Sequence, residues 1–330
     1  MANYTGIQGQ NILIVSSDPA NPTEGQIWYN TTSNLLKGYA NVVTNSWASG
    51  GNLNTARYFG GGAGTQTATL AYGGETPPGA NTTASESYNG TSWTNTPSLS
   101  TARNGIGGIG IQTAALAAGG WTGTPPSSNL VESYNGSSWT SAPTLATVAR
   151  AMGAAGTQTA AIIAGGFQFP STSIATTQLY NGTSWTNSPG NLNTTRHGLV
   201  VTGNPTAAVA FGGASTPDAV TESWNGSAWT NVNNMNTGRR DLMGSGNQTA
   251  SLAFGGQNTV SVTATEIWNG TSWTTTTSMS TARDRGQYSS GATSNSTLVA
   301  GGNEGPPGAA LSATEEWTGT AVAVRTITTS

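Results

Sequence analysis

The heptapeptide YNGTSWT at residues 88–94 returns four times along the chain with few changes. It reads YNGSSWT from 134, YNGTSWT from 180, WNGSAWT from 224 and WNGTSWT from 268, so the steps are 46, 46, 44 and 44 residues. Asn-Gly between two strand-like runs is a strong signal for a β-hairpin with a type I′ turn, which needs positive φ at both residues. A fixed step of this length is typical of repeat architectures.

Two further markers keep the same period. In each copy a double glycine closes an apolar run, an arginine stands 15 to 18 residues before it, and a tryptophan stands 10 or 11 residues before the arginine. The double glycines begin at Gly73, Gly119, Gly165, Gly212, Gly255 and Gly301. The arginines are Arg57, Arg103, Arg150, Arg196, Arg239 and Arg283. The tryptophans are Trp47, Trp93, Trp139, Trp185, Trp229 and Trp273.

Each copy divides into four expected strands. The first is rich in glycine and alanine, the second is apolar and ends in the double glycine, the third carries an aromatic residue, and the fourth contains SWT. Side chains grow from the first strand to the outer ones, as expected if the first strands crowd around a central axis. We therefore expect an all-β fold: a six-bladed β-propeller of four-stranded antiparallel blades, in which YNGTSWT joins the two outer strands.

The pattern resembles the kelch repeat, with its arginine, its apolar strand closing in two glycines, and its spaced tyrosine and tryptophan. The resemblance covers residues 47–317. It departs at Gln178, where the other copies carry glutamate, and after Trp317, which no further tryptophan follows. The resemblance implies a kelch-like propeller.

The two ends of the repeat region leave ring closure open. Trp47 has the register of a fourth strand with no three strands before it, whereas the sixth copy supplies only three strands, through Trp317. A strand ending at Trp47 is the economical candidate to complete the last blade, and the tail AVAVRTI at 321–327 competes for the same edge. We divide the chain into an N-terminal attachment or hairpin segment, 1–40, and the propeller, 41–330.

Composition excludes several functions. Charged residues make up 7% of the chain, with 10 basic and 13 acidic groups and a formal net charge of −3. No basic run can neutralise a series of phosphates, so we expect no nucleic-acid partner. The N-terminal apolar run ILIV at 12–15 is too short for a signal peptide or a membrane span, so we expect no membrane insertion. With no cysteine and one histidine, His197, we expect no metal and no cofactor.

The N-terminal stretch DPANPTEGQIWYNTTSNLLKGY at 18–39 resembles hairpin segments of phage tail-fibre and other virion proteins. The alternative is an ordinary hairpin packed under the propeller. With no export signal, the resemblance implies a chain made in a host cytoplasm and carried on a virion. Its partners would be other virion proteins and copies of itself.

The repeated charges have two interpretations. Five copies carry a glutamate in the third strand: Glu86, Glu132, Glu222, Glu266 and Glu315. In the structural interpretation, these glutamates and the six arginines form charge-assisted hydrogen bonds that tie blade to blade. In the functional one, the arginines ring one mouth of the central channel and bind an anion. Pairing with glutamate would cancel the charge that such a ring needs.

Few residues suit catalysis. Asp241 and Asp284 follow repeat arginines in adjacent copies and are the best candidates for a glycosidase acid pair, although solvated turn acids explain them more simply. His197 follows Arg196 in the same position and is more simply a turn residue than a general base. We therefore expect no catalytic residues.

The connections from second to third strand vary in length and content, and such loops carry binding in repeat proteins. Trp121, Phe167 and Phe169 are loop aromatics that the repeat does not require. They are candidates for stacking on a sugar or for a subunit contact, with packing onto the blade as the alternative.

Two functions are consistent with the sequence. The first is a non-catalytic structural or adhesive virion component, such as a fibre, decoration or baseplate propeller, that contacts proteins or a host-surface glycan. The second is a secreted bacterial propeller that binds or cleaves carbohydrate. The N-terminal motif and the scarcity of catalytic groups favour the first.

Overall fold

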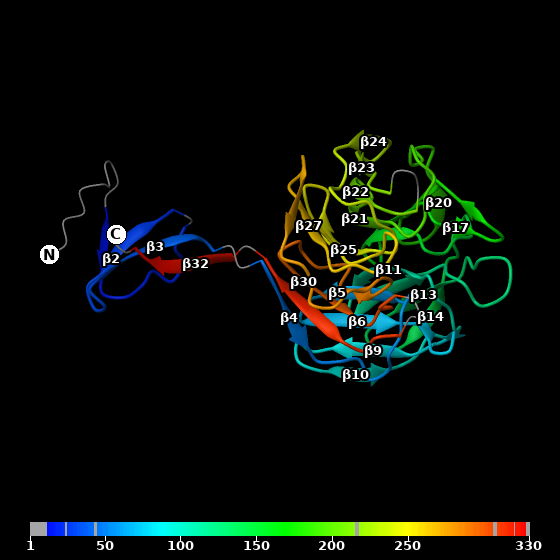
Figure 1. Ribbon diagram of the computed structural model, residues 1–330, viewed down its shortest axis with the longest axis horizontal. Helices are drawn as coiled ribbons and strands as arrows, with labels where there is room; N and C mark the ends of the chain where they lie inside the picture. The colour runs from blue at the N-terminus through cyan, green and yellow to red at the C-terminus, as the bar shows by residue number, and fades with distance from the viewer. Residues whose placement is uncertain are drawn as a thin grey trace. The chain divides into compact units, whose positions relative to one another are not determined.

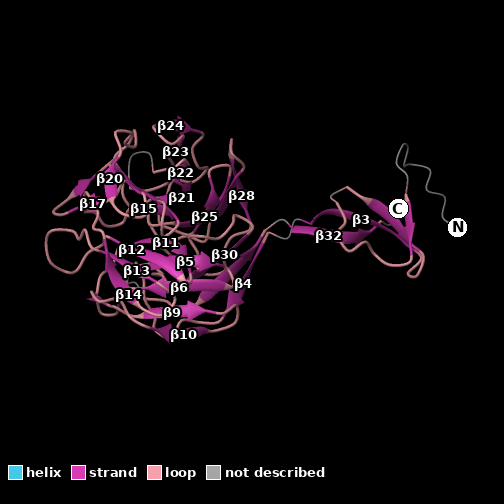
Figure 2. Cartoon of the chain, turned by 180° about the vertical axis from the view of Figure 1, so that it is seen from behind, coloured by secondary structure: helices cyan, strands magenta, loops and turns pink. Residues whose placement is uncertain are grey.

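The computed structural model describes residues 12–23, 25–42, 45–214, 218–305, 309–319 and 321–327. These residues form strands and loops, and no helix occurs among them (Figure 2). The chain divides into two units: Met1–Asn45 with Gly319–Ser330, and Ser46–Thr318.

The larger unit holds six four-stranded antiparallel sheets, which we number 1 to 6 in chain order. In spatial order, sheet 1 consists of β5 (Gly61–Thr65), β6 (Ala68–Tyr72), β9 (Ser85–Tyr88) and β10 (Trp93–Thr96), and sheet 2 of β11 (Gly107–Ile111), β12 (Ala114–Ala118), β13 (Val131–Tyr134) and β14 (Trp139–Ala142). Sheet 3 consists of β15 (Gly153–Gly156), β16 (Ala161–Ala164), β19 (Thr177–Tyr180) and β20 (Trp185–Asn187), and sheet 4 of β21 (Val200–Asn204), β22 (Ala207–Phe211), β23 (Thr221–Trp224) and β24 (Trp229–Val232). Sheet 5 consists of β25 (Met243–Asn247), β26 (Ala250–Phe254), β27 (Thr265–Trp268) and β28 (Trp273–Thr276), and sheet 6 of β29 (Gln287–Tyr288), β30 (Ser296–Ala300), β31 (Thr314–Thr318) and β4 (Ser46–Gly50). Two loops add short hairpins, β7 (Glu75–Thr76) with β8 (Ala80–Asn81) and β17 (Phe167–Gln168) with β18 (Thr172–Ser173).

The first strands of successive sheets contact one another, and β5 contacts both β11 and β29. Figure 1 shows β5, β11, β21 and β25 inside the larger unit, with β10, β14 and β24 at its periphery. The approach is close: a Cβ added to Gly62 would lie 2.2 Å from the backbone oxygen of Tyr288, and one added to Gly108 would lie 2.4 Å from that of Gly62. The small residues of the first strands are therefore a steric requirement. The arrangement is compatible with a β-propeller.

The repeated tryptophan of the fourth strand links one sheet to the previous one. The indole Nε1 of Trp229 donates to the Thr177 hydroxyl at 2.9 Å, and that of Trp273 donates to the Thr221 hydroxyl at 3.1 Å. In sheet 1 the partner lies at the far end of the chain, because Trp93 donates to Thr314 of sheet 6 at 3.0 Å. The motif that recurs in sequence is therefore an inter-sheet contact.

The hairpin that carries the motif differs from the prediction. Tyr88 pairs directly with Trp93, so the connection has four residues rather than two. The side-chain oxygen of Asn89 accepts the N–H groups of Thr91 and Ser92 at 2.9 Å each, and of the Asn-Gly pair only Gly90 has positive φ, 91°. The predicted type I′ turn is wrong, because the asparagine side chain closes the loop and a single left-handed residue completes it.

The structure shows which chain end completes the last sheet. β4 pairs with β31, placing Trp47 opposite Trp317, and supplies the outer strand of sheet 6. The tail strand β32 (Ala321–Thr326) pairs instead with β3 (Leu35–Val42). The domain boundaries therefore differ from the expected division at 40/41. The chain from Gly319 onward belongs with the N-terminal segment, and the larger unit is Ser46–Thr318.

The smaller unit is a four-stranded sheet in the order β1 (Leu13–Val15), β2 (Ile27–Asn30), β3, β32. β1 is parallel to β2, and β2 and β3 form the antiparallel hairpin predicted from the N-terminal motif. The carboxylate of Asp18 accepts hydrogen bonds from Trp28 Nε1 at 3.0 Å, Asn30 Nδ2 at 2.7 Å and Lys37 Nζ at 2.7 Å. Asp18 thereby joins the segment before β2 to both strands of the hairpin.

Candidate functional site

A cycle of backbone hydrogen bonds joins the six segments that precede the first strands. Each segment contributes the residue two positions beyond the repeat arginine, or beyond Ala149 in sheet 3. The bonds run from Phe59 N to Arg285 O, Arg285 N to Asp241 O, Asp241 N to Gly198 O, Gly198 N to Ala151 O, Ala151 N to Gly105 O and Gly105 N to Phe59 O, with distances of 2.6 to 2.9 Å. We call these six residues the hydrogen-bond ring.

All six ring residues have left-handed backbone conformations. Gly105 and Gly198 adopt a φ of 62° at no steric cost, but Phe59, Asp241 and Arg285 hold φ values of 61°, 52° and 54° with large side chains. A non-glycine residue in this region costs of order 1–3 kcal/mol, and such strain is concentrated at functional sites. The same conformation recurs in every repeat, so the ring keeps large side chains at positions that glycine would occupy at lower cost.

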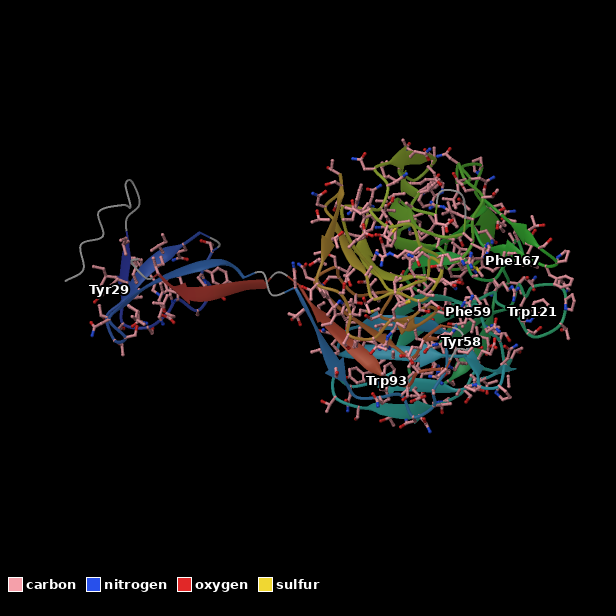
Figure 3. The ribbon with its side chains drawn as sticks, in the orientation of Figure 1. Tyr29, Tyr58, Phe59, Trp93, Trp121 and Phe167 are labelled. Carbon is pink, nitrogen blue, oxygen red and sulfur yellow. The ribbon has the colours of Figure 1, made fainter. Side chains whose placement is uncertain are left out.

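A pocket of about 290 Å³ opens where the six segments meet. We call it the central pocket. All six repeats contribute to its wall, which consists of Tyr58, Phe59, Glu75, Asn104, Arg150, Ala151, Phe167, His197, Asp241 and Arg285. Figure 3 labels Tyr58, Phe59, Phe167 and the neighbouring Trp121 in the larger unit.

Asp241 and Arg285 form an ion pair in the pocket wall. Arg285 donates from Nη2 at 2.9 Å and from Nε at 3.2 Å to the same carboxylate oxygen, which also accepts from Gln257 at 3.0 Å. Burial opposes the charge on Arg285, but the Asp241 and Asp284 carboxylates outweigh it and raise the arginine pKa. The guanidinium also lies 5.2 Å from the Phe59 ring centre. Both charges are thus neutralised in place.

Glu75 organises a second polar group in the same wall. One carboxylate oxygen accepts the Tyr58 hydroxyl at 2.6 Å, and the other accepts Asn104 Nδ2 at 2.8 Å. Burial, together with the bond to Glu75, raises the pKa of Tyr58 to about 12, so the phenol stays protonated and donates. Asn104 donates from the same nitrogen to Asn81 at 2.9 Å, and its own Oδ1 is buried without a partner among the described residues.

The aromatic candidates form one wall, which we call the aromatic wall: Trp121, Phe167 and Phe169. Trp121 and Phe169 are stacked with ring centres 5.6 Å apart. The guanidinium of Arg150 lies over the rings of Trp121 and Phe167. Its central carbon is 5.0 Å from the Trp121 ring centre and 5.1 Å from that of Phe167. Two aromatic faces around one guanidinium are a cation–π arrangement. Burial, and then the charge of Arg285, lower the pKa of Arg150.

His197 completes the wall beside Phe167. The two rings meet edge to face at 4.9 Å, and Nδ1 of His197 lies 2.9 Å from the Ser173 hydroxyl. Burial lowers the pKa of His197 below its ordinary value, so the ring is neutral at pH 7 and can both donate and accept.

Five of the six arginines that the functional interpretation places around one mouth of the central channel are buried inside the sheets. Arg57, Arg103, Arg196, Arg239 and Arg283 have no exposed surface. They pair with Glu86, Glu132, Glu222, Glu266 and Glu315 respectively, at 2.6 to 3.3 Å. These five cannot meet an anion from solvent. Their glutamates also accept backbone N–H groups from the loop entering each sheet, such as Asn236 N to Glu266 at 2.7 Å.

Arg150 does not share the register of the other five. In sheet 3 the buried arginine position is Ala149 and the glutamate position is Gln178, both fully enclosed. Arg150 lies one position later and bridges to Phe167, as Tyr58 bridges to Glu75 and His197 to Ala214 in their repeats. The signal was present in the sequence: Arg150 precedes its double glycine by 15 residues, and Arg57 precedes its own by 16.

The two acid candidates are both paired with Arg285, at 2.9 Å from Asp241 and 3.7 Å from Asp284, but their surroundings differ. Asp241 lines the central pocket, whereas Asp284 is 2% exposed and accepts the Ser261 hydroxyl at 2.5 Å. Burial raises the pKa of Asp284. Of the variable loops at 215–220 and 303–311, the structure describes residues 218–220, 303–305 and 309–311.

Five side chains of the pocket wall were not predicted from the sequence: Tyr58, Phe59, Glu75, Asn104 and Arg285. A usable signal existed, because the two residues after each buried position change in every copy of an otherwise repetitive sequence. They read Tyr-Phe, Asn-Gly, Arg-Ala, His-Gly, Arg-Asp and Asp-Arg. Residue types that vary at the same position of every copy indicate that the repeat fold does not require a particular side chain there.

The described residues contain no group of three or more His, Cys, Asp or Glu side chains placed to hold a metal ion. In the same part of the chain, nothing forms a helix with the length and apolar character that a membrane crossing needs.

No protein-family model matches the chain, and no curated protein matches it. The resemblances to kelch repeats and to virion hairpins therefore remain predictions.

Proposed function

We propose that the chain is a six-bladed β-propeller that acts as a non-catalytic adhesive component of a virion and binds a host-surface glycan in the central pocket. The observation that carries this proposal is the pocket itself. It gathers aromatic rings, an amide, a phenol, an imidazole and charged groups from all six repeats. Aromatic and hydrogen-bonding groups in one concave site are what a sugar ligand requires.

The propeller architecture is supported by links between the two ends of the repeat region. The hydrogen-bond ring returns to its starting residue after six steps. Trp93 of sheet 1 bonds to Thr314 of sheet 6, and Gln66 of sheet 1 donates to the backbone oxygen of Trp317 at 2.8 Å.

A binding role without catalysis is supported by the state of the carboxylates. Glu75 accepts from Tyr58 and Asn104, and Asp241 accepts from Arg285 and Gln257. Each acid is engaged by donors that fix its orientation, which suits a fixed recognition surface.

The attachment role belongs to the smaller unit in this proposal. It joins both chain ends in one sheet and forms a unit separate from the six sheets. Two of its exposed apolar residues, Leu13 at 46% and Ile14 at 71%, lie on the edge strand β1. This unit would fix the chain to other virion proteins or to copies of itself.

Binding is tested by probing an array of bacterial surface glycans with the labelled full-length protein. Phe167→Ala should weaken the positive signals by about 2 kcal/mol or more, as expected for an aromatic anchor. Val260→Ala is the matched control, because Val260 is 56% exposed and lies in the corresponding loop of sheet 5, outside the pocket. Equal binding by wild type and Phe167→Ala would place any glycan site elsewhere.

The alternative is glycan cleavage, which the presence of Glu75 and Asp241 in one pocket keeps as a second candidate. Incubation of the bound glycans with the protein should produce no new reducing ends. Their appearance, and their loss in Asp241→Asn, would replace adhesion with hydrolysis. Mass spectrometry of purified particles from cells that carry the gene tests the virion assignment.

A further inference from the structure

The geometry points to a specific ligand class for the central pocket: a terminal acidic sugar whose carboxylate is bound by Arg150. This inference rests on the proposed glycan-binding function and narrows it. Three features carry it, namely the unpaired charge of Arg150, the polar groups opposite, and the size of the pocket.

Arg150 is the pocket cation that forms no ion pair with a carboxylate of the described residues, and Asp241 and Glu75 act on it only from a greater distance. Among the described residues its guanidinium makes aromatic contacts, and no side-chain hydrogen bond or ion pair is formed by it. Arg285, the other arginine of the wall, is engaged by Asp241 at 2.9 Å. The edges of a guanidinium between two aromatic faces remain available, and their planar fork matches a carboxylate.

The charge on the ligand is limited by the other residues of the wall. Glu75 and Asp241 bring two carboxylates into the same pocket. A phosphate monoester, which carries about two negative charges at pH 7, or a peptide with several acids would meet repulsion from Glu75, whereas Arg285 already compensates the charge of Asp241. A single carboxylate directed at Arg150 would leave the rest of the ligand uncharged beside them.

The remaining wall suits hydroxyl groups. Neutral His197 both donates and accepts, Asn104 Oδ1 is a buried acceptor without a partner, and the oxygens of Glu75 accept from donors. The volume of about 290 Å³ lies at the lower end of the ~300–1,000 Å³ range of small-ligand pockets. One sugar residue matches this volume, and the rest of a longer chain would have to lie outside the pocket.

The test uses the full-length protein and sugar pairs that differ in one group. The probes are the methyl glycosides of glucuronic and galacturonic acid, and N-acetylneuraminic acid, each compared with its neutral amide by calorimetric titration. At least one acid should bind, and its amide should bind about 10- to 100-fold more weakly, since a charge-assisted hydrogen bond is lost.

Substitutions of Arg150 test whether this residue binds the carboxylate of the sugar. Arg150→Gln should reduce binding of the acid to that of its amide, and Arg150→Lys should give an intermediate affinity. Arg240→Gln is the matched control, because Arg240 occupies the same register in sheet 5 and does not line the pocket. Its affinity should equal that of wild type.

Several outcomes would overturn the inference. One is the absence of binding by all three acids, another is equal binding of an acid and its amide, and a third is wild-type affinity in Arg150→Gln. Binding of acidic peptides or phosphate esters in preference to the sugars would also overturn it. Neutral glycans that bind on the array and are lost in Phe167→Ala would leave the adhesive function standing while removing the acidic ligand.

Discussion

The buried arginine is the residue on which each sheet depends most directly. Arg239 has no exposed surface and donates to the backbone oxygens of Gly255 and Ala264 as well as to Glu266 at 3.0 Å. Burial lowers the pKa of Arg239 to about 10, so it remains charged at pH 7. Sheet 3 shows that the fold also accepts an uncharged pair, since Gln178 holds the entering loop by accepting from Thr147 N and donating to Thr147 O.

Removal of one charge should therefore cost more than removal of both. Glu266→Gln leaves Arg239 buried without its counter-ion, and we expect a loss of about 3–5 kcal/mol in the free energy of unfolding. The double variant Arg239→Met/Glu266→Gln keeps the volume and removes the stranded charge. It should lose less than the single variant in urea titrations. A double variant at least as unstable as Glu266→Gln would contradict this account.

Asp18 makes the smaller unit sensitive to acid. Hydrogen bonds from Lys37, then Asn30 and Trp28, lower the pKa of Asp18 from 3.8 to about 2. Because the folded pKa is the lower one, the stabilisation is fully present above the unfolded value and is lost as the pH falls through about 2.

The indole Nε1–H resonance of Trp28, which binds Asp18, should shift between about pH 4 and 2 in NMR spectra, in the window set by that pKa. Asp18→Asn is the control and should remove this titration. A midpoint at the ordinary aspartate value would show that the three donors do not favour the ionised form.

At the scale of the element, the first strands are limited by backbone contact. Gly62 has ordinary negative φ, so its small size is required by the Tyr288 carbonyl oxygen 2.2 Å from an added Cβ. Gly62→Ala should cost about 1–3 kcal/mol of unfolding free energy through overpacking. Gly238→Ala is the control, since its closest contact would be 3.2 Å, and a smaller loss in thermal unfolding is expected. Equal losses would mean that the first strands can separate freely.

The outer hairpins show how one element serves its neighbours. The asparagine closes the loop, the glycine takes the left-handed position, and the tryptophan reaches the previous sheet. The Nε1 groups of Trp139 and Trp185 have no hydrogen-bond partner among the described residues, and Trp139 contacts the previous sheet through Tyr72, with ring centres 4.9 Å apart. The repetition of the motif therefore reflects contacts between sheets as much as the turn itself.

For the whole molecule, the decisive strand is β4, which completes sheet 6 from the other end of the chain. Trp47 packs on Trp317 at 5.4 Å and on Phe254 at 5.1 Å, and it donates to Thr265 of sheet 5 at 3.1 Å. These contacts hold the first strand of the larger unit to its last two sheets.

Trp47→Ala should lose about 3–5 kcal/mol of unfolding free energy. Hydrogen exchange should become faster in β4 and β31 before the other sheets respond, because sheet 6 opens at the junction of the two ends. Trp229→Ala is the matched control, because Trp229 bonds to Thr177 between sheets 3 and 4, and it should not open β4 first. Uniform acceleration across all sheets in Trp47→Ala would show that β4 has no separate role in stability.

The repeat itself was readable from sequence. The strand-length runs, the double glycines and the size of the side chains predicted four strands per copy, because the repeat of 44 to 46 residues aligns the same four segments in successive copies. The turn type was predicted wrongly, since the Asn89 side chain competes for the same amides as a two-residue turn. Arg150 was placed in the wrong register, because its residue type matched the other arginines although its spacing to the double glycine is 15 residues rather than 16 or more.

The tertiary structure alone decided the ends and the site. Ser46–Gly50 and Ala321–Thr326 both carry strand-forming sequence, and only the position of β3 in space made it the partner of the tail. The central pocket depends on residues from Tyr58 to Arg285 that no local pattern connects. They meet because six sheets bring the same register to one place, and that convergence is a property of the packing, not of any one repeat.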